Sequence, residues 1–88
     1  MKLIFCPHCQ DLIKMRIRKR FCACRKAWGQ YEKDGLYAKI GGEAIAIGIY
    51  NGAFTNAVAT RPPFGIGPEF HGFVFPEKSE RVQRVGSK

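Results

Sequence analysis

The stretch Phe5-Cys6-Pro7-His8-Cys9 and, after a twelve-residue spacer that follows Cys9, Cys22-Ala23-Cys24 contain all four cysteines of this 88-residue chain. Each pair is short enough for one tight turn to point both of its sulfur atoms the same way. Structural zinc sites use four thiolate or imidazole ligands at tetrahedral corners. The spacing therefore predicts one zinc ion bound by Cys6, Cys9, Cys22 and Cys24.

Other uses of four cysteines fit the sequence less well. Two disulfides belong to oxidising compartments, and the segment before Cys6 is too short for a signal peptide. A thioredoxin-like redox role needs a βαβ context that Cys6 and Cys9 lack. A rubredoxin-like iron site is the remaining metal alternative. Four thiolates close the coordination shell, so a structural metal is favoured over a catalytic one.

Residues 3 to about 31 resemble a zinc ribbon, in which two hairpin tips hold one metal ion. The usual ribbon has C-x-x-C twice, whereas this chain has C-x-x-C followed by C-x-C. The segments Phe5–Cys9 and Cys22–Gly29 are also similar to short uncharacterised bacteriophage proteins. That resemblance implies a viral protein acting in the host cytoplasm.

The length allows a single small domain, since a chain this short has too little material for a second core. It divides into a zinc ribbon (1–32), a β-rich extension packed on it (33–76) and a flexible polar tail (77–88). No apolar run approaches the ~20 residues that cross a bilayer. A cytoplasmic protein with no membrane partner is therefore expected.

Residue patterns predict a small, mostly β fold with one short helix. Alternating apolar and basic residues over 11–21 are typical of a half-buried strand. The other expected strands are at 2–5, 27–32, 36–40 (broken at Gly41-Gly42), 44–50 and 71–75, although alanine at every second place leaves helix possible for 44–50. We also expect a turn at 33–35, a short helix at 53–60 that ends before Pro62-Pro63, and a loop at 64–70 that packs its aromatic side chains.

The charge is uneven: residues 1–39 carry ten Lys or Arg and three acids, and residues 40–88 carry five and four. On the predicted strand 11–21, alternate residues share a face about 6.5 to 7 Å apart, which matches phosphate spacing along a nucleic-acid strand. Trp28 could stack a base nearby or cover the core. The predicted nucleic-acid contacts, to DNA or RNA, are Lys14, Arg16, Arg18, Arg20, Arg25, Lys26 and Trp28.

The alternative function is binding to an acidic host protein, whose activity the chain would modulate. The aromatic side chains of the extension exceed what a ribbon needs and could form a partner surface. His8 lies inside the first cysteine pair and could replace one cysteine as a ligand, but an exposed knuckle residue is the preferred interpretation. His71 is expected to be a strand-edge or packed residue, and neither histidine has a visible partner for catalysis. We therefore expect no catalysis and no small-molecule substrate.

Overall fold

The computed structural model describes residues 1–85, and it confirms a mostly β chain with one short helix. The strands lie at β1 (Lys2–Phe5), β2 (Leu12–Lys14), β3 (Arg20–Phe21), β4 (Ala27–Tyr31), β5 (Ala38–Gly42), β6 (Ile45–Ile49), β7 (Gly72–Val74) and β8 (Val82–Arg84), and the helix is α1 (Asn51–Ala59).

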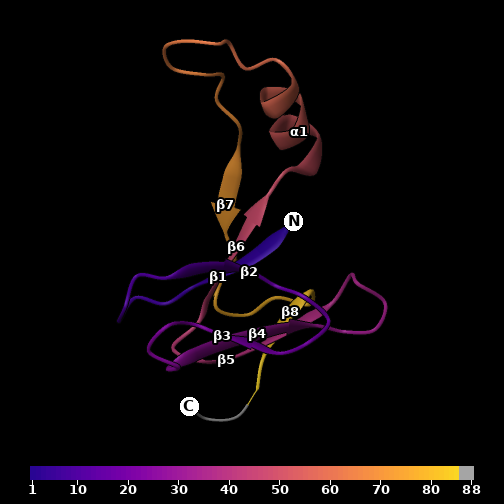
Figure 1. The fold of residues 1–88 in the computed structure, drawn as a ribbon. Coiled ribbons are helices and arrows are strands. Elements are labelled where there is room, and N and C mark those ends of the chain that lie inside the picture. Colours follow the sequence, from indigo (N-terminus) through magenta and orange to yellow (C-terminus); the bar gives the residue numbers. More distant parts are fainter. Residues whose placement is uncertain (86–88) are drawn as a thin grey trace.

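The strands form two four-stranded sheets, sheet A with the order β2-β1-β6-β7 and sheet B with the order β3-β4-β5-β8 (Figure 1). All neighbours are antiparallel except β5 and β8, which are parallel. The core contains Ile4 and Met15 together with small residues such as Ala27 and Ala46. A Cβ atom on Gly29 would lie 2.6 Å from Ile4 Cγ2, so this glycine lets the sheets approach closely.

The single strand expected over 11–21 is wrong, because β2 ends at Lys14 and β3 begins at Arg20 in the other sheet. Met15 donates its N–H to the carbonyl of Lys2, the first residue of β1, so the pairing with β1 ends there. The chain then crosses to sheet B, where Tyr31 donates to the carbonyl of Arg16 at 2.7 Å. The segment 11–21 is divided because its first part pairs with β1 in sheet A and its later part pairs with β4 in sheet B.

The hairpin between β4 and β5 turns at Asp34-Gly35, as the sequence predicts. Gly35 has φ +72°, and the Asp34 carboxylate accepts hydrogen bonds from the N–H groups of Leu36 and Tyr37. The expected break at Gly41-Gly42 is wrong, since β5 continues through both residues. A Cβ atom at Gly41 would collide with the Trp28 ring, so this glycine accommodates a neighbouring side chain.

Residues 50–71 form an arm that carries α1 and lies beyond the ends of β6 and β7, away from sheet B (Figure 1). The predicted helix is confirmed, although it begins earlier, at Asn51. The expectation that the loop 64–70 packs its aromatic side chains is wrong for Phe64, which is 87% exposed. Ile66 is 96% exposed. In contrast, the Phe70 ring packs edge to face against the Phe54 ring, with 4.9 Å between the ring centroids.

The flexible tail expected over 77–88 is not what the structure shows for its described part. Residues Val82–Arg84 form β8, and Val82 is buried in the core. The Arg84 guanidinium donates to the carbonyls of Gly42 and Ala44, which holds β8 on sheet B. Residues 86–88 of the predicted tail lie outside the described residues.

No helix within residues 1–85 is long and apolar enough to cross a membrane.

Candidate metal centre and basic face

The four cysteines lie at the connected ends of two hairpins. Cys6 and Cys9 lie between the paired strands β1 and β2, and Cys22 and Cys24 lie between the paired strands β3 and β4. The hairpins belong to different sheets, so packing of sheet A against sheet B brings the two cysteine pairs together. Cys6 and Cys22 are buried, and the other two are half-buried.

The sulfur atoms have the spacing that a tetrahedral metal site requires. All four lie within 4.8 Å of one another, and Cys24 Sγ lies 3.7 Å from Cys6 Sγ and 3.5 Å from Cys22 Sγ. Ligands about 2.3 Å from a tetrahedral zinc ion are about 3.8 Å apart. The cysteines are free thiols, not disulfides. The cluster can therefore hold a metal ion.

Both cysteine pairs use the same backbone device. The residue that follows the second cysteine of each pair has positive φ, Gln10 at 62° and Arg25 at 65°. Few non-glycine residues adopt this conformation. It lets Gln10 donate its N–H to the carbonyl of Cys6 and Arg25 donate to the carbonyl of Cys22. Each turn is thus closed around its sulfur atoms, although the second pair is one residue shorter.

The thiols of the cluster respond differently to their surroundings. Burial opposes ionisation of Cys22, but hydrogen bonds from the Ala27 N–H and the neighbouring thiols outweigh it and lower its pKa to about 6. Burial raises the pKa of Cys24 to about 12, and the adjacent sulfur atoms add to the rise. Without a cation, one negative charge on the cluster disfavours the next. A divalent metal ion would relieve this repulsion.

Asp11 joins the two cysteine pairs, and the sequence analysis missed it. Its Oδ2 atom accepts a hydrogen bond of 2.9 Å from the N–H of Ala23, which lies between Cys22 and Cys24. Its own carbonyl accepts from the N–H of Cys6 at 2.9 Å. Asp11 is the only acidic residue between Met1 and Tyr31. Its isolation among basic residues was the one feature of the sequence that could have indicated this role.

The predicted row of basic side chains on one strand does not form. Lys14 is at the end of β2, and Arg16 and Arg18 lie in the crossing segment between the sheets. Arg20 shares a face with Gly29 and donates to the carbonyl of Lys14 at 3.0 Å, so it bridges the sheets. The row fails because the strand that would align these residues is divided.

The structure places a different group of cations and aromatic rings on the outer face of sheet B. Trp28 alternates with the buried Ala27 and Gly29, so its side chain points away from sheet A. Phe21 is its direct cross-strand neighbour and is 36% exposed. We call Lys19, Phe21, Arg25 and Trp28 the aromatic-cation cluster. Sequence analysis named Arg25 and Trp28, but it missed Lys19 and Phe21.

The remaining candidates do not gather into a site. His8 and His71 are both exposed, and neither belongs to the cysteine cluster. Lys26 is exposed after the second cysteine pair.

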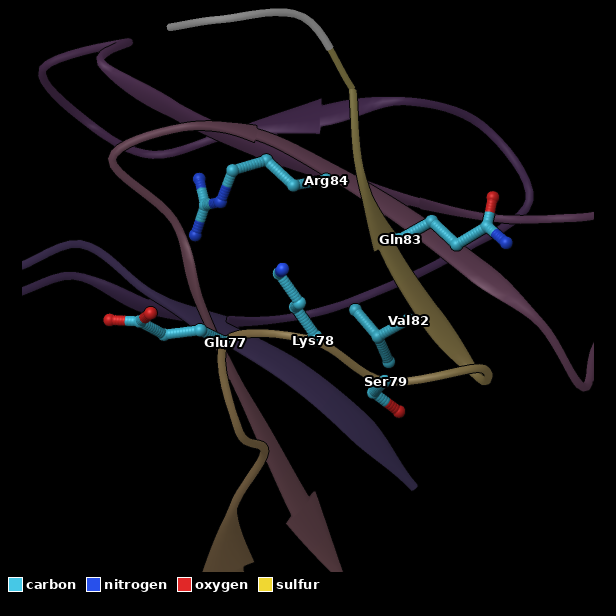
Figure 2. Close-up of a pocket in the computed structure, with 6 residues that line it drawn as sticks. All are labelled: Glu77, Lys78, Ser79, Val82, Gln83 and Arg84. Carbon is cyan, nitrogen blue, oxygen red and sulfur yellow. The ribbon is translucent and has the colours of Figure 1, made fainter.

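The hollow in Figure 2 lies where the chain returns to β8, and it is lined by Glu77, Lys78, Ser79, Val82, Gln83 and Arg84. Its mixed charges favour neither an anion nor a cation.

No protein-family model matches this chain, and neither the curated proteins nor the solved structures contain a significant match to it.

Proposed function

We propose that this chain is a zinc-stabilised, non-catalytic module that binds nucleic acid. The observation that carries the proposal is a basic surface beside the metal centre. From Met15 to Gly29 the sequence has six Lys or Arg and no Asp or Glu. Two of these cations, Lys19 and Arg25, lie on partly exposed aromatic rings. Cations supply affinity for phosphates, and aromatic rings supply stacking surfaces for bases.

Zinc is the metal that suits this donor set. Four thiolates at tetrahedral spacing would hold the ion and leave no coordination position for water, which supports a structural role and no catalysis. Two hairpin ends that share one metal also support the resemblance to a zinc ribbon. Elemental analysis of the purified protein tests the metal, with one zinc per chain expected and iron as the result that would refute zinc.

Nucleic-acid binding is tested by titrating DNA and RNA oligonucleotides with the zinc-loaded protein at several salt concentrations. The logarithm of the affinity should fall linearly with the logarithm of salt, because bound cations release counterions from the phosphates. An affinity that is absent at low salt would contradict the proposal.

Binding to a host protein is the second candidate, and the arm favours it. Phe64 and Ile66 in its loop are almost fully exposed, and Val58 in α1 is also exposed. Such apolar side chains, when gathered on a surface, mark interaction sites. A pull-down with nuclease present, comparing the parent with a Phe64→Ser/Ile66→Ser variant, tests this role. A partner retained by the parent and lost by the variant would support it, whereas identical captures would refute it.

A further inference from the structure

The cations of the aromatic-cation cluster lie on rings and not on carboxylates. Lys19 Nζ is 4.2 Å from the centroid of the Trp28 ring, and Arg25 Cζ is 4.2 Å from the centroid of Phe21. The one side-chain ion pair found within residues 1–85 joins Lys39 to Glu32. Exposed cation–π contacts are weak, so Lys19 and Arg25 can leave the rings for a stronger partner such as phosphate.

The two rings are arranged as neighbouring platforms. Phe21 and Trp28 are directly opposite on antiparallel strands, which places their Cβ atoms about 5 Å apart on one face of the sheet. The Trp28 ring lies against Gly41 on the next strand, where a Cβ atom would collide with it. The Lys19 ammonium group lies over the same ring, 4.2 Å from its centroid.

The backbone that leads to Lys19 is held in place by hydrogen bonds to β4. In the crossing segment, the carbonyl of Arg16 accepts from the N–H of Tyr31, and the carbonyl of Ile17 accepts from the Gln30 side chain at 3.1 Å. Lys19 therefore follows a segment that is fixed beside β4. Its ammonium group can move without disturbing the sheet.

We propose that the aromatic-cation cluster selects single-stranded nucleic acid, an inference that rests on the nucleic-acid function proposed above. Successive bases stack on Trp28 and Phe21 while Lys19 and Arg25 move from the rings to the phosphates. Bases in a duplex are stacked on each other, so only unpaired bases offer their faces to a protein ring. The cluster thus discriminates by access to the base face and not by base sequence.

The helix gives no competing means of reading a duplex. Duplex recognition commonly places a helix in the major groove, with cations contacting base edges and phosphates. Helix α1 carries no charged residue at all between Asn51 and Ala59. It also lies in the arm, away from sheet B (Figure 1).

The experiment uses the zinc-loaded full chain with a 12-nucleotide oligothymidylate and a duplex of the same length. Trp28 is the only tryptophan in the sequence, so its fluorescence reports stacking at this position directly. We expect the single strand to bind more tightly than the duplex and to quench the tryptophan emission. The duplex should leave the emission unchanged.

Two stacking variants and one charge control separate stacking from charge. Phe21→Leu and Trp28→Leu should each weaken single-strand binding by about 5- to 150-fold and leave duplex binding unchanged. The charge control Arg16→Gln/Arg18→Gln should weaken both by the same factor. If Trp28→Leu loses zinc or lowers the melting temperature, Trp28→Phe replaces it and should retain part of the single-strand preference.

Equal affinity for both probes with no quenching would overturn single-strand selection and leave the proposed function standing. Binding of neither probe at low salt would overturn both.

Discussion

The carboxylate of Asp11 accepts a hydrogen bond from the backbone N–H of Ala23, so a residue beside the first cysteine pair fixes the second pair from the other sheet. The two hairpins are therefore connected by a direct contact as well as by the cysteine cluster, which can hold a metal ion. Residues that orient metal ligands from outside the coordination sphere often affect metal affinity almost as strongly as the ligands themselves.

Replacing Asp11 should loosen the metal centre. Asp11→Ala leaves the Ala23 N–H without its acceptor, which should lower the free energy of unfolding by about 1 kcal/mol and weaken zinc binding about tenfold. Asp11→Asn keeps an acceptor oxygen, so it should retain most of the parent's stability and most of its zinc affinity. Urea denaturation and zinc competition with a chelator measure the two effects. An Ala variant that equals the parent would show that the contact is dispensable.

Removal of the metal should unfold the protein. The cysteine pairs close both hairpins, and in small metal-binding domains the free energy of metal binding is largely the free energy of folding. A chelator should therefore abolish the cooperative thermal transition. It should also remove the dispersion of the amide signals in the NMR spectrum. Cys22→Ser and Cys24→Ser should have the same effect, whereas Ser79→Ala should not. A fully folded metal-free chain would contradict the prediction.

Acid should release the metal and destabilise the fold. Thiols in the unfolded chain have a pKa near 8.5, whereas metal-bound thiolates carry no proton. The unfolded state therefore binds more protons below that value, so stability rises with pH and is lost as pH falls. Melting temperature and bound zinc should fall together between pH 7 and about 4. A melting temperature unaffected by that titration would argue against a thiolate site.

Basic residues outside the aromatic-cation cluster should contribute to the salt dependence of binding, in addition to Lys19 and Arg25. Replacing Lys14, Arg16 and Arg18 with Gln should leave zinc content and melting temperature nearly unchanged, since exposed charges add little to stability. The salt slope should become shallower by about two to three. The matched control replaces Lys33, Arg61 and Lys78, which removes the same charge elsewhere. An equal loss in both variants would show that net charge alone governs binding.

The base of the arm should be sensitive to an added methyl group. A Cβ atom at Gly48 would collide with the Phe73 ring on the adjacent strand, so Gly48→Ala should cost about 1 to 3 kcal/mol of unfolding free energy. The control is Gly52→Ala in α1, where nothing lies within 4 Å of the added atom. That change should be neutral or stabilise by up to about 1 kcal/mol. Chemical denaturation compares the two, and equal stabilities would refute the close packing of β7 on β6.

Local sequence patterns determined the elements that depend on near neighbours in the chain. The two cysteine pairs predicted a shared site because each pair needs only its own turn to orient two sulfur atoms. Asp34-Gly35 predicted the hairpin, since only the positive φ of the glycine and the side chain of the aspartate are required. The apolar run before Tyr50 and the Pro62-Pro63 stop likewise predicted β6 and the helix.

Tertiary structure decided everything that depends on which backbone pairs with which. The alternation over 11–21 is the same in one strand or in two. Only the start of β1 at Lys2, where its pairing with this segment stops, and the hydrogen bond from Tyr31 to Arg16 divide the segment between the sheets. That division dispersed the predicted basic row and brought Lys19 over Trp28 instead. Val82 resembled a tail residue because the strand that buries it, β5, lies more than 40 residues earlier in the chain. The periodicity of apolar residues predicts which side chains can share a face of a strand. The neighbouring strand, which supplies the hydrogen bonds and covers that face, is formed by residues far away in the sequence.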